Sequence, residues 1–213
     1  SSAVYIVELA TGVGATEPVS NAKGINGAPA FSPDGTKLAL TLSKSGNPEI
    51  YVMDIASRSL RQITNHYGID TEAVWMPNGQ SLLFTSDRGG KPQIYQVSAS
   101  GGDAKRVSFS GEYNAKATIS FDGKKVATAQ GAGNVYRVAV LDLSFGGSGR
   151  LQLLSPGNLD ESPSFAPNAS MILYATKEGK RGVLYAVSAD GRVRQRLVLS
   201  DGDVREPAWS PYR

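Results

Sequence analysis

An apolar residue recurs in this chain every 44 or 46 residues. The positions three and four residues before it repeatedly hold charged side chains. The recurring apolar residues, called the anchors below, are Phe31, Trp75, Ile119, Phe165 and Trp209. The two positions ahead of them hold Gly27, Ala28, Thr71, Glu72, Ala115, Lys116, Glu161, Ser162, Arg205 and Glu206, with Asp70, Asp160 and Asp203 close by. Carboxylates repeated in one register can orient a charged protein partner, or hold a hard cation such as calcium through their oxygens.

Residues for covalent or acid–base catalysis do not form a recognisable set. The chain has no cysteine and one histidine, His66, which stands in a polar TNHYG segment. The sequence contains no GxSxG elbow, no phosphate-binding glycine loop and no metal-binding histidine pair. It therefore predicts no catalytic residue, no enzyme activity and no resident cofactor or metal. Calcium at the carboxylates is the one ion that the pattern could suit.

The composition suits many short strands rather than helices. The 213 residues include 24 glycines and 11 prolines, and no long stretch has the apolar period of a helix. The net charge is +3 and no five or six like charges follow one another, so the sequence does not favour a nucleic-acid partner. No apolar run approaches the ~18 residues of a membrane-spanning helix, so we expect no membrane insertion.

The anchors belong to a longer repeat. PAFSPDG at 29–35 returns as AVWMPNG at 73–79, ATISFDG at 117–123, PSFAPNA at 163–169 and PAWSPYR at 207–213. In SPDG the proline pre-sets φ, the aspartate bonds to the backbone and the glycine ends the turn. Ala169 replaces that glycine, so another turn type could form there. A period near ~44 residues is typical of a propeller blade with four strands.

Each repeat contains four predicted strands. The first strand and its turn precede a nearly continuous apolar run such as KLALTL, which is typical of a strand covered on both faces. A third strand such as EIYVMD and a short outer strand such as LRQIT follow. The predicted fold class is all-β, a six-bladed β-propeller of four-stranded blades, here incomplete. Residues 1–213 form one partial domain, with blades at about 1–28 (outer half), 29–72, 73–116, 117–162 and 163–206 and a closing strand at 207–213.

Both ends of the chain follow the same register. AVYIVEL at 3–9 matches a third strand and the last repeat matches a first strand, so we expect five strands of the ring to precede Ser1. The anchors Trp75 and Trp209 are expected to fill the space between blades. Three tyrosines in one register are expected to pack on the third strands: Tyr51, Tyr95 and Tyr185.

In a propeller every first strand runs along the central channel in the same direction, so the residues ahead of the anchors should meet at one mouth of that channel. This predicted mouth is rich in carboxylates, with Lys116 and Arg205 among them. The loops between second and third strands should open farther out on the same face, and they carry Lys44, Arg88, Lys91, Lys177, Lys180 and Arg181. We therefore expect an acidic centre within a basic rim, which would steer a charged protein partner.

Several segments resemble the C-terminal β-propeller of the TolB family, namely GAPAFSPDGTKLA, EIYVMDIAS, RQIT, LLFTSDRGGKPQIYQV and PAWSPY, and the resemblance covers all 213 residues. It implies a non-enzymatic protein of the periplasm, in the Tol–Pal system of Gram-negative bacteria, that supports outer-membrane integrity and envelope constriction during cell division. It also implies that the propeller binds the peptidoglycan-associated lipoprotein Pal and that an N-terminal domain absent here binds TolA. Imported toxins use the Pal surface in some members.

In that family the Pal surface lies at the channel mouth, on the loops that enter the first strands. Carried onto this sequence, the resemblance implies a partner-binding set of Asn26, Ala28, Asp70, Thr71, Glu72, Glu161, Arg205 and Glu206. Ile25 stands where relatives tend to have a polar or basic residue, and Lys116 stands where they often have an acidic or neutral one.

Two other functions remain open from the sequence. The chain could be the gating propeller of a serine peptidase, which needs a hydrolase domain with a GxSxG segment, and these residues contain none. It could also bind a sugar or another small molecule, which needs aromatic and polar groups that converge in the channel. The aromatic residues here stand at packing registers instead.

Overall fold

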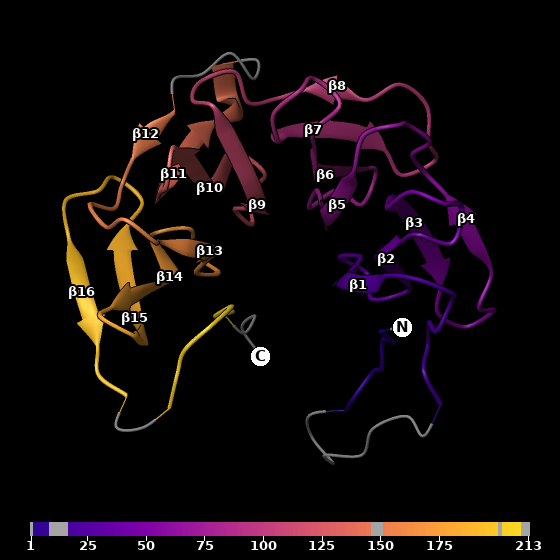
Figure 1. The fold of residues 1–213 in the computed structure, drawn as a ribbon, viewed down its shortest axis with the longest axis horizontal. Helices are drawn as coiled ribbons and strands as arrows, with labels where there is room; N and C mark the ends of the chain where they lie inside the picture. Colours follow the sequence, from indigo (N-terminus) through magenta and orange to yellow (C-terminus); the bar gives the residue numbers. More distant parts are fainter. Residues whose placement is uncertain (1, 9–16, 146–150, 200–201, 210–213) are drawn as a thin grey trace. The chain divides into compact units, whose positions relative to one another are not determined.

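The computed structural model describes residues 2–8, 17–145, 151–199 and 202–209. Within these ranges the chain forms strands β1 to β16 and one short 3-10 helix, η1 (Leu143–Phe145). The strands make four antiparallel sheets of four strands each (Figure 1). Two compact units contain them: residues 1–90 with 96–105, and residues 91–95 with 106–213.

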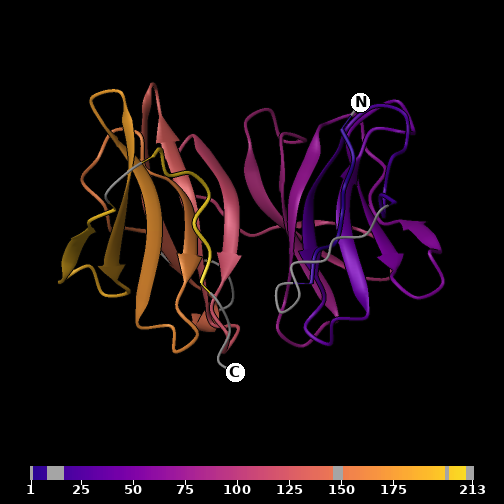
Figure 2. The ribbon, with the colours of Figure 1, turned by 90° about the horizontal axis from the view of Figure 1, so that it is seen from below.

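Within every sheet the strands lie side by side in chain order, and Figure 2 shows the strands and their connecting turns from another side. The first sheet contains β1 (Asn26–Phe31), β2 (Lys37–Leu42), β3 (Glu49–Asp54) and β4 (Leu60–Gln62). The second contains β5 (Asp70–Trp75), β6 (Ser81–Ser86), β7 (Gln93–Ser98) and β8 (Lys105–Arg106). The third contains β9 (Tyr113–Ile119), β10 (Lys125–Ala132), β11 (Val135–Asp142) and β12 (Gln152–Leu153). The fourth contains β13 (Glu161–Phe165), β14 (Met171–Glu178), β15 (Arg181–Ser188) and β16 (Arg194–Leu197). The predicted all-β class and its four-stranded unit are confirmed.

The second and third strands of each sheet carry the core, because neighbouring structure covers both of their faces. Five of the six residues are buried in β2, and five of six in β6. In the first unit, Leu40 of β2 and Tyr51 of β3 belong to one apolar cluster. In the second unit, Val138 of β11 and Tyr174 of β14 share another cluster, which spans the third and fourth sheets. The continuous apolar runs in the sequence therefore predicted these strands correctly.

The turn after each first strand is closed by its own side chains. Asp34 Oδ1 accepts hydrogen bonds from the Ser32 hydroxyl at 2.6 Å and from the Thr36 backbone N–H at 3.0 Å. Ala169 takes a φ of 57°, close to the 70° of Gly35, and its N–H makes the same 2.8 Å bond to the residue three places earlier. A different turn type at Ala169 is thus not found, because the alanine accepts a left-handed conformation that costs ~1 kcal/mol.

The anchors differ in burial. Trp75 is 6% exposed and donates from Nε1 to the Ala30 carbonyl at 3.0 Å, which confirms its predicted place between two sheets. Trp209 is 39% exposed, so the prediction of a core residue is wrong for that tryptophan, and Phe31 is 55% exposed. Trp75 is buried because β1 of the preceding sheet packs on β5, and Phe31 has no equivalent sheet before it among the described residues of its unit.

The ends of the chain are less regular than predicted. In place of a third strand at residues 3–9, Val4 makes an isolated antiparallel bridge with Ser20. Val4 and Val19 are nevertheless buried against the core of the first sheet. Residues 207–209 form no strand, and residues 210–213 lie outside the described part of the chain.

Candidate functional site

The residue three places ahead of each anchor has a left-handed backbone. Ala28, Glu72, Lys116, Ser162 and Glu206 have φ angles of 46°, 56°, 53°, 54° and 48°. In β1, β5, β9 and β13 the pairing with the second strand shifts register at this residue. Each of these first strands therefore contains a β-bulge, which locally re-aims a side chain and is over-represented beside functional sites. We call these five residues the bulge residues.

The bulges could not be predicted from residue type, because none of the five is glycine. Holding a non-glycine residue at positive φ costs of order 1 kcal/mol, and such strain tends to persist where the surrounding structure requires it. Three members of the predicted partner-binding set, Ala28, Glu72 and Glu206, are bulge residues. The register that the sequence singled out therefore coincides with a repeated backbone distortion.

In the first unit, Thr71 and Glu72 lie beside β2 and β6. The hydroxyls of Thr71 and Thr41 are 3.3 Å apart, and the Glu72 backbone N–H donates to the Thr41 hydroxyl at 3.3 Å. The Thr85 hydroxyl donates to the Glu72 carboxylate, also at 3.3 Å. Both Thr71 and Glu72 are half-buried, so they hold defined positions while part of each remains accessible.

In the second unit, Lys116 brings two other bulge residues together. Its Nζ donates to the Ser162 hydroxyl at 3.2 Å and to the Glu206 carboxylate at 3.4 Å. The Glu206 side chain is 76% exposed, so this is a surface contact between residues ninety positions apart in the chain. Glu161 is half-buried at the start of β13, and Arg205 is exposed and pairs with Asp203 at 3.3 Å.

Two predicted partner-binding residues are buried. Asn26 is 3% exposed, and its Oδ1 accepts hydrogen bonds from the Ser20 hydroxyl at 2.7 Å and the Ala22 N–H at 2.9 Å. Asp70 is 0% exposed. The Asn26 side chain holds the backbone that leads into the first bulge, and neither residue offers a surface to a partner in this conformation.

Asp70 belongs to a buried cluster that we call the charged node: Glu49, Thr64, His66, Asp70 and Arg88. Glu49 accepts hydrogen bonds from the Thr64 hydroxyl at 2.6 Å and from the His66 backbone N–H at 2.7 Å. Arg88 Nη2 donates to Asp70 Oδ2 at 2.6 Å. Burial raises the pKa of the Glu49 carboxyl above its ordinary value, and the nearby Asp70 carboxylate raises it further, against the hydrogen bonds that lower it.

The equivalent cluster one repeat later, which we call the neutral node, consists of Gln93, Ser108 and Asn114. Gln93 Oε1 accepts hydrogen bonds from the Ser108 hydroxyl at 2.7 Å and from Asn114 Nδ2 at 2.9 Å. Sequence reasoning missed both nodes. A signal was present, since the same 44-residue spacing relates Glu49 to Gln93, Thr64 to Ser108 and Asp70 to Asn114.

The predicted basic rim holds only in part. Arg88 turns inward to Asp70, with its side chain 16% exposed and its guanidinium carbon 5.2 Å from the Phe84 ring centroid. Arg88 is therefore a core residue, because the buried carboxylate of Asp70 needs a counter-charge. Lys177 and Lys180 are exposed, and Lys91 makes an exposed 2.7 Å pair with Glu112.

Within the described ranges, no three histidine, aspartate or glutamate side chains come together as a metal site would require. The same ranges contain no helix that is long and apolar enough to cross a membrane. The suggestion of a calcium ion at the carboxylates therefore has no donor set of this kind among the described residues.

The chain repeats a four-stranded antiparallel sheet at a regular spacing, and each sheet starts with a bulged strand. This repeated unit is the blade of a β-propeller. A family profile described as "TolB beta propeller domain" matches residues 1–213, and the chain belongs to that family. The Tol-Pal system protein TolB of Xanthomonas campestris pv. campestris is 73% identical over 116 residues, which cover 54% of this chain and 26% of that protein. The crystal structure of TolB from Acinetobacter baumannii has a TM-score of 0.89 and 49% identity, and covers 99% of this chain and 52% of that one.

The chain thus spans about half the length of the solved relative that it matches. A more distant structure, puromycin hydrolase, has a TM-score of 0.65 at 15% identity and covers 79% of this chain and 28% of that one. At that identity the likeness shows a shared propeller fold alone.

Proposed function

We propose that this chain is the non-enzymatic propeller of a Tol–Pal system protein in the periplasm and that it binds the lipoprotein Pal through the loops that enter its first strands. The observation that carries the proposal is the row of bulge residues, because the same strained conformation recurs at the one register that holds Glu72, Lys116 and Glu206. Family membership supplies the partner, and the bulges indicate the surface.

The chemistry of the bulge region suits a protein partner. Glu72 and Thr71 in the first unit are half-buried and held by hydrogen bonds, which lowers the entropy lost when a partner binds. Glu206 and Arg205 are exposed charges, which act more on association rate and register than on affinity. The expected interface has a few dominant contacts near its centre.

The wider role belongs to the same proposal. As part of a longer protein, the chain would support outer-membrane integrity and envelope constriction during cell division. An N-terminal domain outside these residues would bind TolA, and imported toxins could compete for the Pal surface.

A binding measurement tests the proposal directly. Purified chain would be titrated with lipid-free Pal from Xanthomonas campestris by calorimetry, for the wild type and for Thr71→Arg. We expect the variant to weaken binding by at least ~10-fold, because an arginine would displace the contact between Thr71 and Thr41 and occupy the bulge region.

A matched control is Thr36→Arg, since Thr36 is exposed in the turn before β2, at the opposite end of that strand from Thr41, the residue that Thr71 contacts. That variant should bind as the wild type does. Undiminished binding by Thr71→Arg would place the contact elsewhere, and no binding by the wild type would remove Pal as the partner. Charge reversal of Glu72 and Glu206 together should slow association, and an unchanged rate would argue against steering by these carboxylates.

A further inference from the structure

The second unit contains a cavity of about 220 Å³ between its two sheets. Among the described residues, its lining includes Tyr113, Lys116, Ala129, Tyr136, Leu159, Glu161 and Lys177. They come from β9, β10, β11, β13, β14 and the segment before β13. The cavity is smaller than the ~300 Å³ at which sites for drug-sized ligands begin, so it suits one amino-acid side chain.

Aromatic rings form the apolar wall of the cavity. Tyr113 and Tyr136 lie edge to face, with ring centroids 5.4 Å apart and ring planes at 81°. Both pair across strands with Gly131 of β10. A Cβ at Gly131 would lie 2.9 Å from Tyr136 Cε1 and 3.1 Å from Tyr113 Cδ1, so the glycine allows both rings to sit over β10. Leu159 completes this wall and is 44% exposed.

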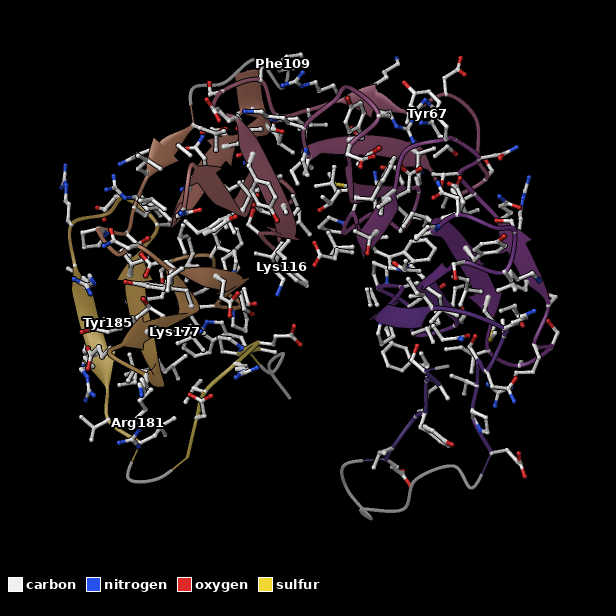
Figure 3. All side chains as sticks on the ribbon, viewed as in Figure 1. Tyr67, Phe109, Lys116, Lys177, Arg181 and Tyr185 are labelled. Carbon is white, nitrogen blue, oxygen red and sulfur yellow. The ribbon has the colours of Figure 1, made fainter. Side chains whose placement is uncertain are left out.

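Long hairpins bring the other lining groups to the cavity. β10, β11, β14 and β15 have eight residues each, whereas the second and third strands of the first two sheets have six. The added length places Tyr136 near the start of β11 and Lys177 near the end of β14. In Figure 3, the labelled Lys116 and Lys177 project from β9 and β14 of this unit.

The charges that line the cavity are unequal. Two lysines, Lys116 and Lys177, and one glutamate, Glu161, are among the lining residues. Lys116 already bonds to Ser162 and Glu206. Lys177 makes no ion pair within 4.0 Å among the described residues and is exposed, so its ammonium can pair with an incoming anion at little desolvation cost.

We propose that this cavity receives one acidic side chain of the protein partner, with its aliphatic stem against the tyrosine rings and Leu159 and its carboxylate at Lys177 and Lys116. The inference rests on the proposed function, because that function supplies the partner. It adds a specificity pocket that the bulge residues alone do not define. Glutamate fits better than aspartate, since its longer stem reaches past the apolar wall.

Two charge variants test the sign of the ligand. Lys177→Met should weaken Pal binding about fivefold, and Glu161→Gln should strengthen it about twofold, because one removes the attracting charge and the other removes a repelling one. Lys124→Met is the matched control: Lys124 is exposed in the turn after β9, at the far end of that strand from Lys116, and its loss changes net charge equally. Gly131→Ala should also weaken binding, because it displaces the rings without changing charge.

The outcomes separate the two proposals. If the wild type binds Pal and Lys177→Met binds equally well, the pocket inference is wrong while the proposed function stands. Weaker binding by Glu161→Gln would also overturn it, since a basic side chain would then be the ligand. If the wild type does not bind Pal, the proposed function fails, and a titration with N-acetyl-glutamate amide decides the pocket alone. Shifts of the Leu159 methyl NMR signals with that probe, and none with N-acetyl-lysine amide, support the pocket; the reverse pattern, or no shift, overturns it.

Discussion

The charged node and the neutral node occupy the same positions in consecutive repeats. They form the same kind of buried hydrogen-bond network, one with carboxylates and the other with amides. In the charged node, the Thr64 hydroxyl donates to Glu49 at 2.6 Å and accepts from the Ile50 N–H at 2.9 Å. In the neutral node, the Ser108 hydroxyl donates to Gln93 at 2.7 Å and accepts from the Ile94 N–H at 2.9 Å. The hydrogen-bond frame is therefore common to both, and the charge is not part of it.

The difference lies in what each node needs from its surroundings. Gln93 and Asn114 bond directly through their amide groups, so the neutral node needs no counter-charge, although Asn114 Oδ1 is buried without a hydrogen-bond partner among the described residues. Glu49 and Asp70 are two acids in one buried cluster, so Arg88 must turn inward to balance one of them, and the pKa of the other rises. The stability of the charged node therefore depends on a third residue, Arg88, and on pH, whereas the amides of the neutral node create neither dependence.

The largest expected effect is the loss of the arginine. Arg88→Met leaves Asp70 buried beside Glu49 without its counter-charge, and it should lower the free energy of unfolding by about 3 kcal/mol. Urea denaturation measures the change. Lys91→Met serves as the control, because its ion pair with Glu112 is 64% and 63% exposed and should contribute less than about 0.5 kcal/mol. A loss below about 1 kcal/mol for Arg88→Met would mean that the charged node does not depend on its arginine.

Conversion of the charged node toward the neutral one should reverse part of this loss. Adding Asp70→Asn to Arg88→Met should recover about 1–2 kcal/mol, because the amide removes the unbalanced charge and can donate to Glu49 as Asn114 donates to Gln93. A double-mutant cycle measures the coupling between Arg88 and Asp70. Additive losses in that cycle would contradict the pairing as the source of the effect.

The pH dependence of stability should distinguish the two nodes. The folded-state pKa of Glu49 lies above its ordinary value of 4.5, so the folded chain keeps this proton longer than the unfolded chain does. The stabilisation is present below pH 4.5 and is lost as the pH rises through the raised pKa. Glu49→Gln lacks that loss, so its stability relative to the wild type should increase with rising pH. Urea unfolding at a series of pH values checks the slope.

The reciprocal variant gives the control for that slope. Gln93→Glu places a carboxyl in the neutral node and should introduce a loss of stability with rising pH that the wild-type node lacks. A Gln93→Glu profile parallel to the wild type would show that burial at this register does not raise the pKa of an acid.

The smallest effect is expected in the turns, where a charged and a neutral residue again share one register. Hydrogen bonds from Ser32 and then Thr36 lower the pKa of the exposed Asp34 from 3.8 to about 2, whereas Asn78 fills the same place in the second sheet. The stabilisation by Asp34 is present above pH 3.8 and is lost as the pH falls through about 2. Asp34→Asn should therefore make acid unfolding, followed by circular dichroism, less steep, and an unchanged curve would contradict this assignment.

Much of the fold was predictable because its signals are local. The segments KLALTL and EIYVMD match the bounds of β2 and β3 to the residue, since a strand covered on both faces has no polar alternation to obscure its ends. The candidate site was less accessible to sequence reasoning. Glu72 and Glu206 of the predicted partner-binding set lie on bulges that the sequence did not predict, and Asn26 and Asp70, two residues ahead of a bulge residue, are buried.

The sequence by itself determined the repeat, the strands of the four complete sheets and the family, because each depends on residue types a few places apart or on a constant spacing. The tertiary structure alone decided where Arg88 points, which residues accept a positive φ, and that Lys177, Glu161 and Tyr136 line one cavity. These outcomes depend on how side chains from different strands share the same buried space and the same counter-charge. The residues involved are far apart in the sequence, so no single stretch of sequence predicts the result.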